Sequence, residues 1–340
     1  MVICDENMFV IIKECRCCGF CFCSKNWIWF GVKDVFYFKG VNDMEKVLVL
    51  MATYNGEKYL QEQLDSIYAQ RDVDVRILVR DDGSKDSTLS ILADNEKKHQ
   101  LCWYQGTHLN VQKGFYELMT KATDYDCDYF AFCDQDDVWD LDKLKIAIDA
   151  IENIEIPMLY YSGQRLVDEN LNFIENHRLN EYRTLKTRFV LSDFAGCTGV
   201  FNRALLNEII SFEPEYMLMH DTWILRVCLC LGGNVVVDPN PHMNYRQHSG
   251  NTLGLGHSVG ATIKQVRQYI YEYQIERLTR ELLRGYGDRM IPEYKELAEV
   301  ICSYRVNGES RKYLLNKNNV DFVSKGLNAT YRIKVKINKL

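Results

Sequence analysis

Short apolar runs alternate with amphipathic stretches between residues 46 and 151. Four of the runs are too short for helices and are typical of buried strands: 47–51, 75–79, 101–104 and 129–133. Between and after them, apolar residues recur at helical spacing in four stretches: 57–69, 87–97, 115–122 and 143–151. Strands that alternate with helices in this way predict an α/β fold, a Rossmann-like, mostly parallel sheet flanked by helices.

The second half of the chain has a less regular pattern. It predicts strands at 158–163, 199–202 and 235–238, and helices at 204–210 and 221–231. Beyond residue 260 the apolar residues are spaced for one face of a helix, and they are Ile263, Val266, Ile270, Tyr273, Leu278 and Leu282. We therefore expect a main α/β domain at 44–255 and a helical C-terminal region at 256–340.

Charge is distributed unevenly along the 340 residues. Residues 261–340 hold 16 Lys and Arg against 9 Asp and Glu, so this region carries +7, whereas the whole chain carries −6 and the first 260 residues −13. Such a basic region is typical of a solvated helical face, or of a contact with an anionic membrane surface. We expect no nucleic-acid partner. No apolar run reaches 18 residues and no signal sequence is evident, which predicts a cytoplasmic protein.

Six of the thirteen cysteines lie within the first 23 residues. Cys15, Cys18 and Cys21 have the spacing of zinc ligands, but no second ligand pair follows at the usual distance along the chain. The segment also lacks a clear period. We therefore expect residues 1–43 to be an extension outside the catalytic fold, with Met44 as the native start. The seven later cysteines lie in apolar stretches, which is typical of reduced core thiols.

Polar loops follow three of the predicted strands: 52–57, 81–84 and 134–137. Ligands of an open parallel sheet bind at the carboxyl ends of its strands, so the topology gathers these loops at one edge. Taken singly, they also fit an Asn-Gly turn, an N-cap and an acidic helix start. Taken together, they predict a nucleotide site formed by Thr53, Tyr54, Asn55, Glu57, Asp81, Asp82 and Asp134.

Each loop suits one part of a nucleotide. Glu57 is placed to accept from ribose hydroxyls, and Asp82 to accept the N3–H of a pyrimidine while Asp81 or Ser84 braces the loop. Asp134 and Asp136 are expected near ribose and a hard divalent ion, Mg²⁺ or Mn²⁺, which bridges a diphosphate.

Five motifs in this order resemble the family 2 glycosyltransferases with the GT-A fold. They span about 200 residues, and they are Ala52–Glu57, Arg80–Ser84, the DxD-type Asp134–Trp139, His220–Trp223 and Tyr245–His248. The Asp-Gln-Asp-Asp-Val-Trp form, with Tyr-Arg-Gln-His downstream, is most similar to the rhamnosyltransferase branch. That branch uses dTDP-rhamnose or a related donor in bacterial surface polysaccharide synthesis.

The resemblance assigns further roles. Asp221 is implied as the base that deprotonates the acceptor hydroxyl, although His220 stands beside it where members often have Glu or an aromatic residue. Asp136 and His248 are implied as metal ligands. Contacts with donor or acceptor are implied for Asp137, Trp139, Gly196, Cys197, Thr198, His220, Trp223 and Arg246, of which 196–198 match the loop under the donor sugar.

The expected function is an inverting, metal-dependent transfer of a sugar from dTDP-rhamnose or a UDP-sugar to a glycan or lipid-linked acceptor. The Gln-x-x-Arg-Trp element and membrane helices of processive members are missing, which favours single addition. Two alternatives stay open: a sugar-nucleotide nucleotidylyltransferase, which usually has a basic residue after its first strand, and a non-catalytic carbohydrate-binding protein. The basic C-terminal region is expected to contact the inner face of the membrane or to form a homodimer interface.

Overall fold

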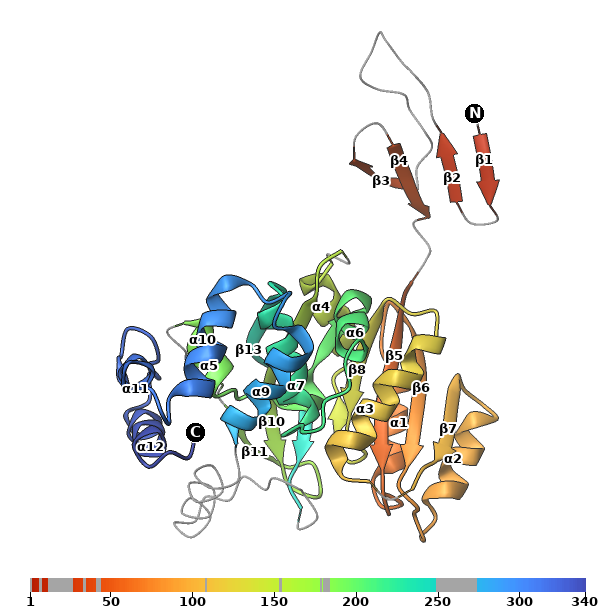
Figure 1. Ribbon diagram of the computed structural model, residues 1–340. Coiled ribbons are helices and arrows are strands. Elements are labelled where there is room, and N and C mark those ends of the chain that lie inside the picture. Colours follow the sequence, from red (N-terminus) through yellow and green to blue (C-terminus); the bar gives the residue numbers. More distant parts are fainter. Residues whose placement is uncertain are drawn as a thin grey trace. The chain divides into compact units, whose positions relative to one another are not determined.

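The computed structural model describes residues 2–5, 8–11, 27–32, 35–40, 44–107, 109–152, 155–177, 179, 184–248 and 274–340. The chain divides into two compact units, Met1–Glu45 and Lys46–Leu340. The first unit contains two antiparallel hairpins (Figure 1): β1 (Val2–Asp5) with β2 (Met8–Ile11), and β3 (Trp27–Val32) with β4 (Val35–Gly40). The predicted zinc spacing, residues 15–21, lies outside the described residues.

A mixed sheet is the frame of the second unit, with strand order β7-β6-β5-β8-β12-β10-β13-β9 and with β11 paired to β10. The strands are β5 (Glu45–Thr53), β6 (Val73–Asp81), β7 (Leu101–Gln105), β8 (Tyr129–Cys133), β9 (Val138–Trp139), β10 (Met158–Val167), β11 (Phe173–His177), β12 (Val200–Asn202) and β13 (Asn234–Arg246). Pairs β5–β8, β6–β7 and β10–β13 are parallel. Strand β12 is antiparallel to both β8 and β10, and β9 is antiparallel to β13.

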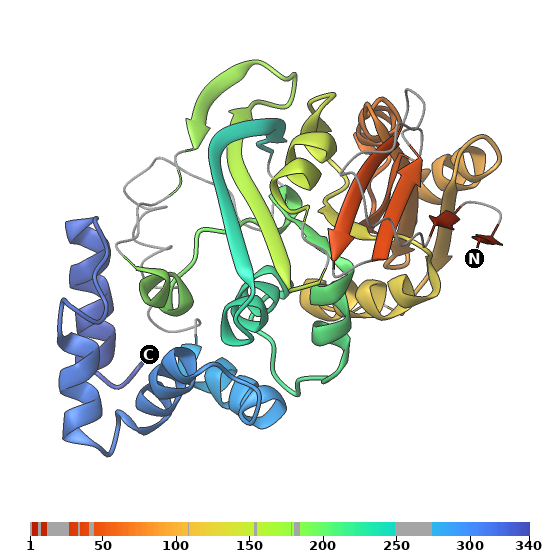
Figure 2. The same cartoon turned by 90° about the horizontal axis from the view of Figure 1, so that it is seen from above.

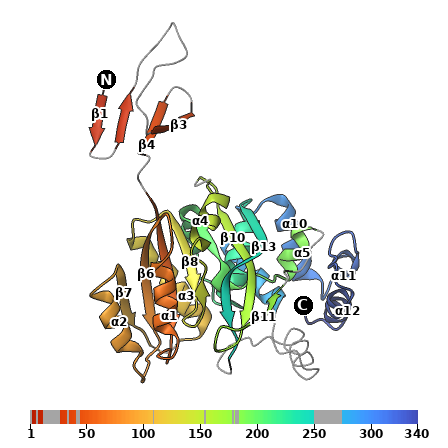
Figure 3. The same ribbon diagram turned by 180° about the vertical axis from the view of Figure 1, so that it is seen from behind.

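Helices cover both faces of this sheet. They are α1 (Leu60–Tyr68), α2 (Thr88–Glu96), α3 (Val111–Lys121), α4 (Lys143–Ala150), α5 (Leu185–Val190), α6 (Arg203–Ile210), α7 (His220–Cys230), α9 (Ile275–Tyr286), α10 (Pro292–Ser303), α11 (Gly308–Leu315) and α12 (Lys325–Lys336). Successive side chains of a strand point to opposite faces. In β5, Val47, Val49 and Met51 pack in the same core as α1, α2 and α4. Leu48 and Leu50 pack in the core of α3, α6, α7, α9 and α10. Figure 1 is viewed from the α3 and α7 side, and Figure 3 from the side of α1 and α4.

The C-terminal helices extend the core in which Leu48 and Leu50 pack. Leu278 and Leu282 of α9 are fully buried, as the helical period predicts, whereas the predicted apolar positions at 263, 266, 270 and 273 lie outside the described residues. Helices α11 and α12 lie at the margin of this unit farthest from β7 (Figure 2). Among the helices that the structure describes, none is both long and apolar enough to cross a bilayer.

Candidate active site

Hydrogen bonds join the loop after β5 to the loop after β6. The Asn55 backbone N–H donates to Ser84 Oγ at 2.8 Å, and the Lys85 N–H donates to Asn55 Oδ1 at 2.9 Å. Glu57 Oε2 accepts the N–H of Ser87 at 2.9 Å. Asn55 has a φ of 49°, in the left-handed region that asparagine adopts more readily than most residues. These bonds hold the two loops as one surface, from which the Asn55 and Glu57 side chains are exposed.

Gln135 connects the loop after β8 to the same surface. Its Oε1 accepts the Tyr54 N–H at 2.9 Å, and its Nε2 donates to the Tyr54 carbonyl at 3.2 Å. A Cβ on Gly56 would lie 2.4 Å from Gln135 Oε1, so a larger residue at 56 would displace the Gln135 amide from this position. The structure thus brings the three polar loops together at the carboxyl edge of the sheet, as the topology predicts.

Asp81 and Asp82 have different surroundings. Asp81 is fully buried, and its Oδ1 accepts the N–H groups of Gly83 and Ser84, both at 2.9 Å. Its Oδ2 accepts from the hydroxyls of Ser84 and Thr53. Asp81 therefore holds the turn, and Asp82, which is 14% exposed, is the carboxylate that a ligand can reach.

The buried guanidinium of Arg80 holds the Asp82 carboxylate in position. Arg80 is fully buried, pairs with Asp82, and also contacts Glu117 of α3 through its Nε at 3.0 Å. Its Nη2 donates to the Thr107 carbonyl at 2.7 Å. A Cβ on Gly106 would lie 2.4 Å from Nη2, so this glycine is needed for the guanidinium to fit.

Three carboxylates crowd the end of β8. Burial, followed by repulsion from Asp136 and Asp221, raises the pKa of Asp134 to about 7. Burial and the neighbouring carboxylates of Asp134 and Asp136 raise the pKa of Asp137 well above its ordinary value, although Asp137 Oδ1 accepts the Arg246 N–H at 3.2 Å. Such a cluster is stabilised when it binds a cation.

Two sets of side chains offer ligand atoms for a metal. Asp136 Oδ2 and His248 Nε2 lie 2.7 Å apart, with 16% and 14% of their side chains exposed. Asp134, Asp137 and Cys197 offer atoms within 4.8 Å of one another. Burial raises the pKa of the Cys197 thiol well above its usual range, and a protonated thiol is a poor ligand for a hard ion. The carboxylates and His248 therefore fit Mg²⁺ or Mn²⁺, whereas Cys197 does not.

Arg246 lies beneath the acidic turn rather than in an open cleft. It is 2% exposed; its Nε donates to the Asp136 carbonyl at 2.9 Å and its Nη1 to the Glu169 carbonyl at 2.6 Å. Nη2 pairs with Glu62, and the guanidinium lies 4.4 Å from the centre of the Tyr59 ring. These contacts give Arg246 a positioning role, and its expected contact with donor or acceptor stays a prediction.

Asp221 lies in the first turn of helix α7, where the resemblance places the base. Its Oδ2 accepts the Gly196 N–H at 3.2 Å, and its Oδ1 accepts the Thr222 N–H. Burial raises the pKa of Asp221 to about 6, so the group is ionised at neutral pH and still basic enough to take a proton. The 3₁₀ turn Gly196–Thr198 thus holds Asp221 beside the acidic cluster.

His220 and the two tryptophans are interior residues. The His220 ring stacks on Phe115 at 4.0 Å, and burial lowers the pKa of His220 to about 3, so it is neutral. A Cβ on Gly196 would lie 2.4 Å from His220 Nε2. Trp223 is fully buried beside Phe212 and Tyr286, and Trp139 is 3% exposed. The structure therefore places these three side chains in the core behind the site, where contact with a ligand would require them to move.

The sequence pattern gave no role to Gln135, Arg80 or Lys143. Lys143 is 1% exposed, and its Nζ lies 3.5 Å from the centre of the Trp139 ring, close to the charge of Asp137. Burial lowers the pKa of Lys143 to about 8. A lysine in the first turn of a helix usually projects into solvent, so no sequence signal marked this residue. For Arg80 the glycines at 106 and 114 were the available signal, because both lie against its guanidinium.

Comparison with known proteins identifies the family and the fold. Residues 48–210 match the family model for glycosyl transferase family 2. The chain is 30% identical over 253 residues to the dTDP-rhamnosyl transferase RfbG of Shigella flexneri, an alignment that covers 68% of this chain and 84% of that protein. It is 24% identical over 291 residues to an uncharacterized glycosyltransferase of Rickettsia typhi, covering 79% and 83%.

Two solved structures share the fold. TarS 1-349 of S. aureus in complex with UDP-GlcNAc aligns with a TM-score of 0.52 at 19% identity and covers 86% of this chain and 89% of that chain. The mannosyltransferase PcManGT of Pyrobaculum calidifontis, in complex with GDP-Man and Mn²⁺, aligns with a TM-score of 0.51 at 14% identity and covers 88% of each. This chain therefore belongs to glycosyl transferase family 2, and it is a glycosyltransferase with the GT-A fold.

Proposed function

We propose that this enzyme transfers a sugar, with inversion, from dTDP-rhamnose or a UDP-sugar to a hydroxyl of a glycan or lipid-linked acceptor in bacterial surface polysaccharide synthesis. One observation carries the proposal: the turn that donates its Gly196 N–H to Asp221 at 3.2 Å also holds Cys197, whose sulfur lies within 4.8 Å of the Asp134 carboxylate. A base for the acceptor and a carboxylate cluster for the leaving diphosphate therefore adjoin at one edge of the sheet. The relative RfbG supports dTDP-rhamnose as the first donor to test.

Donor binding is assigned to the joined loops. Asp82, which pairs with Arg80, would accept the N3–H of a pyrimidine, and the exposed Glu57 would contact the ribose. Asp134, Asp136 and His248 would hold a divalent ion, which when bound supplies positive charge to the diphosphate. The 196–198 turn would lie under the donor sugar, and Gly196 lets the turn pack closely against the buried His220 ring.

Asp221 performs the proton transfer in this proposal. Its carboxylate takes the proton of the acceptor hydroxyl while the acceptor oxygen attacks the anomeric carbon from the face opposite the leaving group. The bond from the anomeric carbon to the diphosphate oxygen breaks as the new glycosidic bond forms, so no covalent sugar–enzyme intermediate is needed. The N–H groups of Gly196 and Thr222 hold the carboxylate in place, and the Asp134 charge favours its protonated form once the proton has moved.

Nucleotide release from a donor panel tests this function. We expect release from dTDP-rhamnose or a UDP-sugar in Mn²⁺ or Mg²⁺, and loss of release in EDTA. Asp221→Asn keeps the size of the side chain and should lower turnover by about 10²–10⁴-fold, the usual contribution of a general base, while donor affinity stays within about twofold. The assignment would be refuted if the wild type released no nucleotide from any donor of the panel. It would also be refuted if Asp221→Asn kept wild-type turnover.

We further propose a cytoplasmic enzyme that meets its acceptor at the inner face of the membrane. The basic excess is confined to the last part of the chain, because residues 307–340 hold eight Lys and Arg against two Asp and Glu, whereas 274–306 hold six of each. On α12, Ile333 is 50% exposed, and Ile337, one residue beyond the helix, is 45% exposed; Lys325, Lys336 and Lys339 are exposed with them. Apolar side chains among lysines suit an anionic bilayer surface. A homodimer contact through the same face is the alternative.

A further inference from the structure

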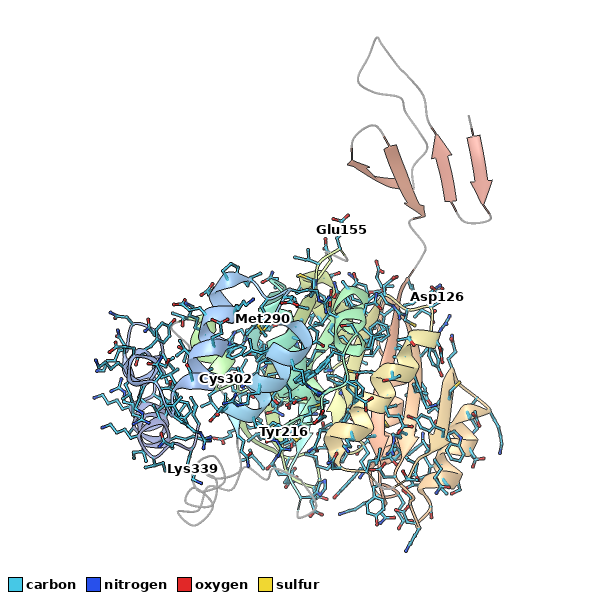
Figure 4. All side chains as sticks on the ribbon, viewed as in Figure 1. Asp126, Glu155, Tyr216, Met290, Cys302 and Lys339 are labelled. Carbon is cyan, nitrogen blue, oxygen red and sulfur yellow. The ribbon has the colours of Figure 1, made fainter. Side chains whose placement is uncertain are left out.

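A cavity of about 590 Å³ lies between helix α3 and residues 213–217, the segment that leads into α7. Its lining includes Tyr116, Glu117 and Gln112 from α3, and Glu213 and Tyr216 from the segment. None of the residues expected in the donor or metal site lines it. Figure 4 labels Tyr216 in the lower half of the view, toward which β5 and β6 run.

Contacts with the rest of the protein hold the walls of this cavity in place. The Tyr116 hydroxyl donates to the Phe212 carbonyl at 3.2 Å, and Glu117 pairs with the buried Arg80 at 3.0 Å. The Arg277 guanidinium lies 4.2 Å from the centre of the Tyr216 ring. Because these walls are already ordered, a ligand does not have to order them on binding.

The chemistry of the lining favours a neutral, hydroxyl-rich ligand. Two tyrosines supply flat apolar surface with a polar end, and carboxylate and amide groups supply acceptors and donors for hydroxyls. The charged lining residues are three glutamates and two lysines, so a diphosphate or another anion gains nothing from the net charge. The volume falls within the range of roughly 300–1,000 Å³ that is usual for small-molecule sites.

The cavity is close to the chemistry along the chain. Met217 lines it, and Asp221 follows four residues later, so their Cα atoms are at most about 14 Å apart even if the segment is fully extended. Glu117, through Arg80, also connects the cavity wall to Asp82 of the donor loops. A chain of a few sugar rings that begins at Asp221 can therefore reach the cavity.

We propose that this cavity binds the sugar rings of the acceptor glycan that lie behind the hydroxyl that is glycosylated. The proposal rests on the sugar transfer proposed above and names the acceptor class, an oligosaccharide rather than a single sugar or a bare lipid. Acceptor length is then a determinant of affinity, because rings beyond the first gain contacts with Tyr116, Tyr216 and Glu213.

Filling the cavity tests the proposal. Thr120→Trp and Gln112→Trp add an indole on the cavity side of α3, and Glu296→Trp on the exposed face of α10 is the matched control. The probes are methyl glycosides of mono- to tetrasaccharides of rhamnose and of hexoses, with dTDP-rhamnose as donor. We expect wild-type KM to fall as the acceptor grows. Each cavity variant should raise KM for tri- and tetrasaccharides at least about tenfold, which corresponds to a loss of about 1.4 kcal/mol of binding.

Two further readouts separate the two proposals. Nucleotide release without acceptor should be equal in the wild type, both cavity variants and the control, because donor and metal residues are untouched. Saturation-transfer NMR should detect tetrasaccharide binding to the wild type and to Glu296→Trp, and not to Thr120→Trp. The cavity assignment alone is overturned if nucleotide release is normal and the acceptor KM does not change with acceptor length. The same holds if nucleotide release is normal and the cavity variants have the KM values of the control. Absence of release from every donor instead overturns the proposed transfer.

Discussion

Replacement of Arg246 distinguishes a positioning role from a ligand contact. In Arg246→Met the carbonyls of Asp136 and Glu169 lose charge-assisted hydrogen bonds of 2.9 and 2.6 Å, and Glu62 loses its ion pair. Breaking a buried pair by removing one partner costs about 3–5 kcal/mol. Glu62 is half exposed and is hydrated once the guanidinium is gone, so we expect a loss near 3 kcal/mol. For a unit of this size that loss corresponds to a decrease in Tm of roughly 5 °C.

The same change should loosen the acidic turn, because Arg246 holds the backbone of Asp136. We therefore expect Mn²⁺ affinity, measured by calorimetry with the nucleoside diphosphate present, to fall about tenfold, a coupling of ~1.4 kcal/mol. Arg246→Lys can replace one of the three polar contacts, so its Tm should lie between those of the Met variant and the wild type. Thermal unfolding followed by circular dichroism measures Tm.

A donor or acceptor contact would give a different pattern. If Arg246 acts on the ligand, both variants should raise the KM of that ligand while Tm and Mn²⁺ affinity stay at wild-type values. A Tm of Arg246→Met within about 1 °C of wild type would therefore refute the reasoning from burial and hydrogen bonding.

Three further outcomes are expected. Since burial raises the pKa of Asp221 to about 6, the base becomes protonated below that pH, and kcat should fall about tenfold per pH unit there; a flat acidic limb would exclude Asp221. A chain that starts at Met44 should keep the Tm and activity of the full chain, because the chain divides after Glu45, and loss of folding would contradict this. Charge reversal of Lys325, Lys336 and Lys339 to Glu should lower binding to anionic vesicles by at least about 100-fold at ~1 kcal/mol per lysine, measured by co-sedimentation, whereas neutral vesicles should show no difference.

The central strands of the first half, β5 and β8, could be predicted from the sequence because they are buried on both faces. Val47–Met51 and Tyr129–Cys133 are nearly solvent-free, so their apolar runs stand out against the polar loops. The ends of β10 and β13 were missed. Strand β13 contains Pro239 and Pro241, and most of its side chains are partly exposed, so it shows neither an apolar run nor alternation. It is defined by its parallel pairing with β10, a long-range contact that local pattern does not reveal.

The sequence predicted which loops form the candidate site. It did not predict which side chains of those loops are buried and which are exposed. Topology alone placed 52–57, 81–84 and 134–137 at one edge. Which of two adjacent aspartates faces the ligand depends on hydrogen bonds to Asp81 that form only in the folded turn. In the same way, His220 and Trp223 stand next to the predicted base in sequence, yet the helix turns both side chains into the core. The orientation of these side chains follows from packing of the whole helix, which residue type alone does not reveal.

The bonds that join the three strand-end loops also limit how this enzyme can be re-engineered. Replacing the loop after β8 alone would remove the two hydrogen bonds that Gln135 makes with the Tyr54 backbone, and with them the side chain that packs against Gly56. Replacing the loop after β6 alone would disrupt the bond from the Asn55 N–H to the Ser84 hydroxyl and the bond from the Lys85 N–H to Asn55 Oδ1. Donor preference in chimaeras with related enzymes should therefore transfer when the three segments are exchanged together, and single-segment chimaeras should lose donor binding whatever nucleotide they are offered.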